Sequence, residues 1–177
     1  MKKLGAFSAV LFFALICGTG TATATSASAT MAVSVTVSSS VSFVLQTDAS
    51  GLALTNSGAS AVTAPFGTMS AYGGSVPVGV TRTVNAPTDW TISTPFDVVV
   101  QVANQSSSNF TLTAQLQSSD STNTWQITST TVTSASAATL TSTGAYGTTV
   151  FTLHLTIPFS ESAGTISNTI NFVATAN

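Results

Sequence analysis

Large apolar residues alternate with small or hydroxyl-bearing residues over the stretch 29–45, ATMAVSVTVSSSVSFVL. Successive side chains of a β-strand leave opposite faces, so this alternation is typical of a strand with one buried face. A helix would not gather these residues on one stripe. The apolar set lies at odd-numbered positions: Met31, Val33, Val35, Val37, Val41, Phe43 and Leu45. The stretch predicts an amphipathic strand that must pair with its own sheet or with a neighbour's.

The same period of two recurs along the rest of the chain, and no run of ten or more residues has helical periodicity. The clearest alternating runs are Phe96–Val102, Phe110–Leu116 and Phe151–Phe159, and a last strand is expected over 166–174. Shorter strands are expected at 52–54, at 76–84 and from Trp90 to Ile92, with Thr94-Pro95 as an interruption. Short strands joined by polar turns predict an all-β, antiparallel, immunoglobulin-like β-sandwich of about eight to ten strands.

The first 29 residues have the pattern of a secretory signal peptide. Lys2 and Lys3 precede an apolar run that ends at Cys17, and small residues follow, with Ala24 or Ala29 as the cleavage position. Such a run is shorter than a membrane span. We therefore expect 30–177 to form a single β-sandwich domain that is secreted or held at the cell surface, with no stable membrane span after cleavage.

Charge is scarce in the expected mature domain. Only 5% of the whole chain is charged, and Arg82 is the one cation after Lys3 apart from His154. Phosphate binding requires several cations, so the composition excludes a nucleic-acid partner. No cysteine follows Cys17, so no disulfide can staple the fold, which must rest on burial of about 148 residues.

No constellation of residues predicts catalysis, a cofactor or a metal. His154, the one histidine, lies at an even position of a run whose odd positions are apolar, so we expect it to face outward. Nucleophile elbows, P-loops and dinucleotide fingerprints are lacking. The turns at 48–51 and 120–123 contain Asp or Asn, as calcium loops do. They have fewer acidic residues than a calcium loop, which favours a role in local turn hydrogen bonding. We therefore expect a protein that is not an enzyme.

Four aromatic residues could form a sugar-binding platform. Trp90 and Trp125 share the parity of neighbouring apolar residues, which predicts that both lie in the core. Tyr72 and Tyr146 stand beside glycines in expected loops and stay candidates.

Two stretches resemble secreted bacterial β-sandwich proteins of the pilin and spore-coat-U type. One is Pro65-Phe66-Gly67-Thr68-Met69, and the other is the closing hairpin LHLTIPFSESAGTISNTINFVATA. The resemblance implies a structural subunit assembled outside the cell by donation of a terminal strand, with an export chaperone as a further partner. The cysteines usual in several pilin families are lacking here.

The shortage of charge favours assembly independently. Free sheet edges are normally protected by lysine or other charges, and a partner strand is an alternative cover. We expect a structural subunit of a surface filament, pilus or extracellular matrix, present as a homo-oligomer or polymer. An extracellular carbohydrate-binding or adhesion module is an alternative, and an outer-membrane β-barrel is a less favoured one. Whether the opening strand pairs within its chain or with a neighbour stays open.

Overall fold

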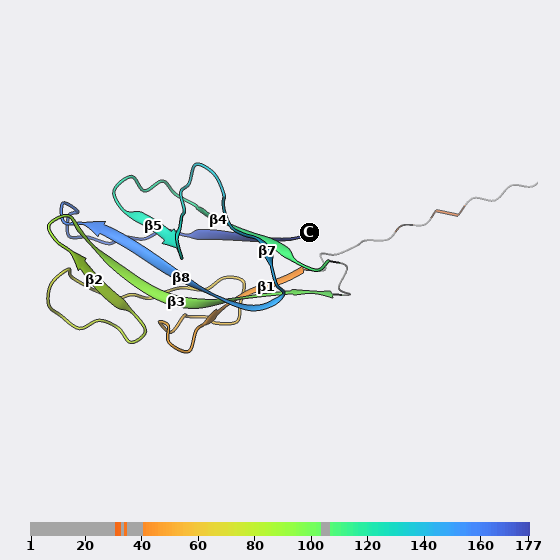
Figure 1. Ribbon diagram of the computed structural model, residues 1–177, viewed down its shortest axis with the longest axis horizontal. Coiled ribbons are helices and arrows are strands. Elements are labelled where there is room, and N and C mark those ends of the chain that lie inside the picture. Colours follow the sequence, from red (N-terminus) through yellow and green to blue (C-terminus); the bar gives the residue numbers. More distant parts are fainter. Residues whose placement is uncertain (1–30, 33, 35–40, 104–106) are drawn as a thin grey trace, which may run out of the picture. The chain divides into compact units, whose positions relative to one another are not determined.

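The computed structural model describes residues 31, 32, 34, 41–103 and 107–177 (Figure 1). The expected signal peptide at 1–29 lies outside these residues. The chain divides into two units, Met1–Thr36 and Val37–Asn177, and all the strands belong to the second. These are β1 (Val41–Thr47), β2 (Thr81–Asn85), β3 (Asp89–Val102), β4 (Phe110–Leu116), β5 (Thr124–Ile127), β6 (Thr130–Thr131), β7 (Ala138–Gly144), β8 (Gly147–Pro158) and β9 (Ile170–Ala176).

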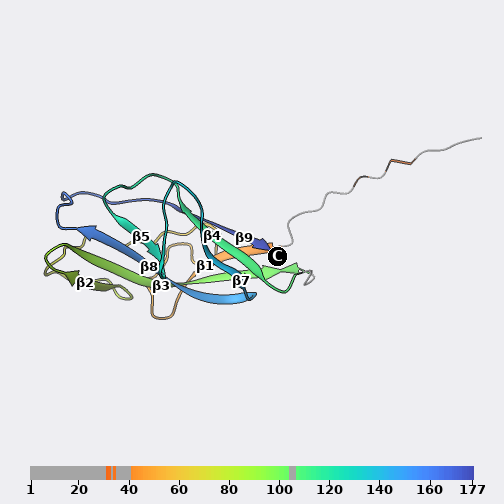
Figure 2. The same cartoon turned by 45° about the horizontal axis from the view of Figure 1, so that its top comes forward.

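Two antiparallel sheets form the second unit, as Figures 1 and 2 show. The larger sheet has the order β1-β3-β8-β5-β6, with β2 also paired to β3, and the smaller has the order β7-β4-β9. No α-helix occurs among the described residues. The prediction of an all-β sandwich is confirmed.

β3 and β8 form the spine of the larger sheet, paired from Asp89–Pro158 to Val100–Gly147. Residues of β3 alternate between buried even positions and half-buried odd ones up to Val100. Thr94-Pro95 does not interrupt this strand, so the expectation of two strands is wrong. β3 pairs with β2 as far as Ser93 and with β1 from Phe96 onward, so no strand lies beside Pro95 on that edge. The missing N–H of Pro95 therefore removes no ladder bond there.

The core lies between the sheets. The four inward residues of β4, the central strand of the smaller sheet, are at most 3% exposed, and Trp90 and Trp125 are buried as parity predicts. Leu155 and Ile157 of β8 are buried as well, whereas Leu153 and Phe159 are only half-buried. The inward residues of β4 are Phe110, Leu112, Ala114 and Leu116.

The segment between β1 and β2 is the part of the fold that alternation predicts worst. No strand forms at 52–54, and the expected strand at 76–84 is reduced to β2. Val78 is 93% exposed, because Pro77 provides no N–H and Gly79 adopts a positive φ of 81°. The segment 52–78 leaves and rejoins the sandwich at one narrow place, which we call the neck.

Four residues make the neck. Thr94 Oγ1 accepts a hydrogen bond from Leu52 N (2.7 Å) and donates one to Gly79 O (2.8 Å). A Cβ atom on Gly79 would meet the backbone of Gly51, and one on Gly51 would meet the carbonyl oxygen of Pro95, so neither position has room for a side chain. A single buried hydroxyl thus joins both ends of the segment to β3.

Candidate functional site

The residues proposed for subunit pairing fall into two groups. Val41 and Phe43 belong to β1, where they pair with Val102 and Val100 of β3 in the same chain. Met31 is 86% exposed and belongs to no strand. Val33, Val35 and Val37 lie outside the described residues. The part of the opening stretch from Val41 onward therefore pairs within its chain, and only 31–37 is left as a candidate for pairing elsewhere.

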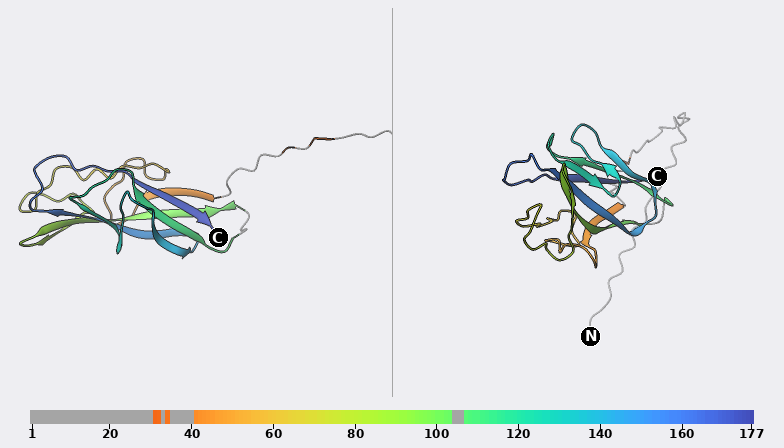
Figure 3. Two further views of the ribbon diagram at one scale, coloured as in Figure 1. Left: turned by 90° about the horizontal axis from the view of Figure 1, so that it is seen from above. Right: turned by 60° about the vertical axis from the view of Figure 1, so that its left-hand side comes forward.

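β1 and β9 lie side by side at one edge of the sandwich, one in each sheet (Figure 3). Phe43 of β1 stacks on Phe172 of β9 with ring centroids 6.2 Å apart, and Phe172 meets Phe96 edge-on at 5.9 Å. The inward side chains of β9, Ile170 and Ala174 included, are only half-buried. This edge of the sandwich is less well closed than the centre.

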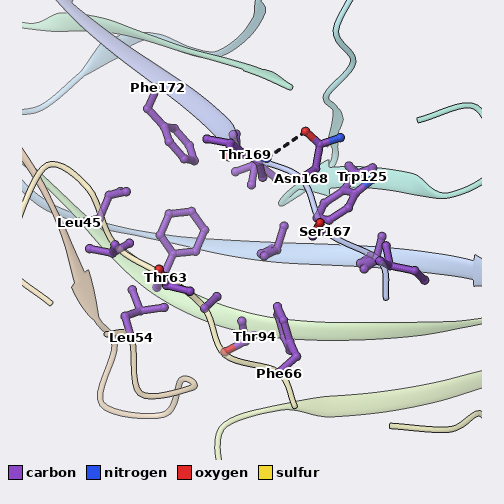
Figure 4. A pocket seen from close by; sticks show the side chains of 18 residues that line it. Leu45, Leu54, Thr63, Phe66, Thr94, Trp125, Ser167, Asn168, Thr169 and Phe172 are labelled. Carbon is purple, nitrogen blue, oxygen red and sulfur yellow. Dashed lines mark hydrogen bonds between the residues drawn. The ribbon is translucent and has the colours of Figure 1, made fainter. Parts of the chain in front are cut away.

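A pocket of about 380 Å³ lies between the sheets at this edge. Figure 4 shows its lining side chains, which come from both sheets and from the segment 52–78. A well-packed interior has few voids larger than a water molecule, so this volume leaves the core incompletely filled. We call this volume the seam pocket; its larger apolar lining residues include Leu45, Phe66, Phe96, Trp125, Leu153 and Phe172.

Two polar side chains of the seam pocket, those of Asn168 and Thr94, are occupied by structural bonds. Asn168 Oδ1 accepts from Ser118 N (3.2 Å) and Thr169 N (2.9 Å), and its Nδ2 donates to Ser118 O (2.8 Å). Thr94 serves the neck. No lining residue carries a charge. The pocket therefore suits an uncharged, apolar occupant and has no side chain placed for acid–base chemistry.

The backbone beside the seam pocket has one open edge. Asn177 N donates to Asn109 O and Gln117 N donates to Thr169 O, so odd-numbered residues of this stretch face β4. By the alternation of an antiparallel ladder, the N–H and C=O groups of Ile170, Phe172 and Ala174 point the other way. β9 has no second strand partner among the described residues.

The edge of β1 differs at Leu45. Leu45 N donates to Ala59 O (2.9 Å) and Gly58 N donates to Leu45 O (2.7 Å). The segment 52–78 thus covers this edge where it reaches the seam pocket. A strand added along the pocket could therefore pair with β9 but not with β1.

Other candidate residues have structural roles. Tyr146 donates its hydroxyl to Asn109 O (3.0 Å) and packs on Phe110, so it is part of the scaffold. His154 lies on the outer face, opposite Ser93 and Gln126, as expected. Tyr72 is 65% exposed and remains accessible.

The aspartates of the two acidic turns accept hydrogen bonds from neighbouring residues of the same turn. Asp48 accepts from Ser50 N and Ser50 Oγ. Asp120 accepts from Asn123, Thr122 and Trp125 Nε1, the last at 2.8 Å. Burial opposes ionisation of Asp120, but these hydrogen bonds outweigh it and lower the pKa of its carboxyl. The geometry favours the interpretation as turns, since the carboxylate oxygens face donors.

Sequence reasoning missed the seam pocket as a site. Alternation predicted that lining residues such as Trp125 and Leu153 belong to the core, but it shows only which face is buried and not how completely that face is covered.

The comparisons with known proteins give no relative. No family model, no curated protein and no solved structure matches this chain. Among the described residues there is no group of three or more potential metal ligands, and no helix that could cross a membrane.

Proposed function

We propose that this protein is a secreted structural subunit that assembles into a surface filament, pilus or extracellular matrix by β-strand pairing between copies. The observation that carries this proposal is the seam pocket, an apolar gap in the core beside the open edge of β9. A strand added to β9 would bond to its free backbone groups and send alternate side chains into the gap, which is β-augmentation.

The segment 31–37 of a second copy fits this place. Its residues Met31, Val33, Val35 and Val37 alternate with Ala32, Ser34 and Thr36, so one face is apolar. It contains no charge, as the pocket lining contains none. Extended, it spans about 23 Å, the length of the seven residues of β9.

The test compares the secreted protein with Val35→Asp and Ser34→Asp by light scattering, with circular dichroism alongside. We expect the wild type to form oligomers that grow with concentration. Val35→Asp should abolish them without loss of the β spectrum, because a charge would enter an apolar gap. Ser34→Asp, on the opposite face, is the matched control and should assemble nearly as well.

A wild type that stays monomeric at every concentration would refute the proposal. Loss of the folded spectrum in Val35→Asp, with a monomeric wild type, would show instead that 31–37 completes its own sandwich. In that case the segment 31–37 would fill the seam pocket of its own chain, and no assembly between copies would be needed.

Cysteine chemistry can locate the partner strand, since no cysteine follows Cys17. Ser34→Cys protein mixed with Val173→Cys protein should form a disulfide between copies, because Val173 is 57% exposed on the outer face of β9. Ser42→Cys, on the exposed face of β1, is the control. Preferential cross-linking to Ser42→Cys would place the added strand on β1.

A further inference from the structure

Trp125 forms part of the wall of the seam pocket. It lies on β5 and pairs across the sheet with Leu155 of β8, which lines the pocket as well. Its side chain is only 7% exposed, and Figure 4 shows it among the lining residues. The indole is therefore shielded from solvent but borders an unfilled volume, and it has no packing contacts on that side.

An indole in this place has room to turn into the pocket. A cavity of about 150 Å³ accepts a benzene ring, and the seam pocket has a volume of about 380 Å³. Turned inward, the ring of Trp125 would occupy the space that the side chains of an added strand need. Packing cannot oppose this movement, because the empty side of the ring has no neighbouring atoms. Packing alone therefore does not keep the pocket open.

Asp120 holds the indole by its polar atom. Trp125 Nε1 donates a hydrogen bond to Asp120 Oδ2 (2.8 Å). Burial opposes ionisation of Asp120, but its hydrogen bonds lower the pKa of the carboxyl, so it is ionised at neutral pH. A hydrogen bond to a charged group contributes more than one between neutral groups. The bond therefore fixes the orientation of the ring strongly.

The carboxylate is itself held by the turn 120–123. Asp120 Oδ1 accepts from Thr122 N (3.1 Å) and Asn123 N (2.9 Å), and Asn123 Nδ2 donates to Oδ2 (3.1 Å). Each of these contacts is made by a donor, as is the contact with Trp125 Nε1. An amide of the same shape would turn its own N–H groups toward one of these donors. Asp120→Asn is therefore an isosteric change that should break part of the arrangement.

We propose that Asp120 is a positioning residue for assembly, which holds Trp125 back from the seam pocket and keeps the pocket open for the strand of a second copy. This inference rests on the proposed function, because it concerns how the same pocket is kept ready. An incoming strand need not displace the indole, which is the advantage of preorganisation. The interpretation of 120–123 as a turn is thereby extended, since one carboxylate serves both the turn and the pocket wall.

Light scattering of the Asp120→Asn and Trp125→Phe proteins tests the role in assembly. Each variant should need about tenfold more protein than wild type to assemble, since a hydrogen bond to a charged group is lost. The double variant should be no weaker than either single one, because both substitutions remove the same bond. Asp89→Asn is the matched control and should assemble as wild type does. Its carboxylate also accepts side-chain hydrogen bonds, but from Asn85 and Thr88, which do not line the pocket.

Near-ultraviolet circular dichroism reports the position of Trp125 independently of assembly. The Trp90→Phe protein is the reference, since the chain has only two tryptophans. In this reference, Asp120→Asn should remove about half or more of the Trp125 signal, because that signal depends on a fixed environment of the ring. The far-ultraviolet β spectrum should stay unchanged. Asp89→Asn should leave both spectra as they are.

Three results would overturn this inference. They are assembly of Asp120→Asn at wild-type concentrations, an unchanged Trp125 signal in that variant, and a double variant that combines the full losses of both single ones. The last result would show that the carboxylate supports only its own turn. A wild type that is monomeric at every concentration would instead refute the proposed function, and the role of Asp120 in assembly with it.

Discussion

A Cβ atom on Gly79 would lie 2.1 Å from both the carbonyl carbon and the carbonyl oxygen of Gly51. Gly79 also has a φ of 81°, which side-chain-bearing residues rarely adopt. Gly79→Ala should therefore lower the free energy of unfolding by about 3–5 kcal/mol, since backbone at the neck must move and the strained φ must be kept. Urea denaturation followed by circular dichroism measures this change.

Gly67 provides the matched control. Its φ is 69°, but nothing lies within 4 Å of a Cβ built there. Gly67→Ala should cost about 1–2 kcal/mol, from the backbone conformation alone. Equal costs at Gly67 and Gly79 would show that the close approach at the neck contributes nothing to stability.

The strand β8 allows a test of the seam pocket by three neighbouring substitutions. Leu155 is 5% exposed, and Leu155→Ala should cost about 2–5 kcal/mol, as large-to-small changes in a packed core do. Both residues line the seam pocket, but Leu153 is only half-buried, so Leu153→Ala should cost less, about 1–2 kcal/mol.

His154 lies between them on the outer face. His154→Ala should cost under about 0.5 kcal/mol, as substitutions away from packed contacts usually do. Thermal or urea denaturation of monomeric protein gives the order of the three costs. A cost for Leu153→Ala equal to that of Leu155→Ala would mean that the seam pocket is filled in solution.

Asp97 should make stability depend on pH in an unusual direction. Burial raises the pKa of its carboxyl, and repulsion by Asp48 raises it further. Because the folded-state pKa exceeds the unfolded value, the ionised form is penalised in the folded protein. That penalty is fully present above the folded pKa and is relieved as pH falls through it toward about 3.8, the unfolded value.

Asp97→Asn should consequently be more stable than wild type at pH 7, and the difference should shrink as pH falls toward 4. Melting temperatures of both proteins between pH 4 and 7 measure it. Asp89→Asn is the control with the opposite sign, because hydrogen bonds from Asn85 and Thr88 lower the pKa of Asp89. A wild type more stable than Asp97→Asn at pH 7 would contradict the argument.

Alternation predicted the sandwich well wherever both sheets cover a strand. The inward residues of β4 and the two tryptophans are buried because side-chain parity and burial are directly linked in a strand. Val78 shows the limit of this reasoning. Its neighbours Val76 and Val80 have the right spacing, but Pro77 and Gly79 set a backbone conformation that no ladder can use.

The seam pocket and the continuity of β3 depend on how the strands are ordered and paired, which the spacing of apolar residues along the sequence does not show. Pro95 is tolerated because the pairing of β3 with β2 stops at Ser93 and its pairing with β1 starts at Phe96, which is a property of three strands together. The open edge of β9 follows from sheet order in the same way. Local patterns predict which face of a strand is buried, whereas strand order decides which edges are left without a neighbour.

The neck has a dynamic consequence. The segment 52–78 is joined to β3 at both of its ends through one hydroxyl, Thr94 Oγ1. The same segment is also bonded to Leu45 and Thr47 of β1. It should therefore open as a cooperative unit when both sets of bonds break, and its amides should exchange hydrogen with a common opening free energy, below that of global unfolding. Because Leu54, Val62 and Phe66 line the seam pocket, that opening would also widen the pocket. Access to the gap in the core would then depend on the bonds that hold this segment to Thr94 and to β1, and not on separation of the two sheets.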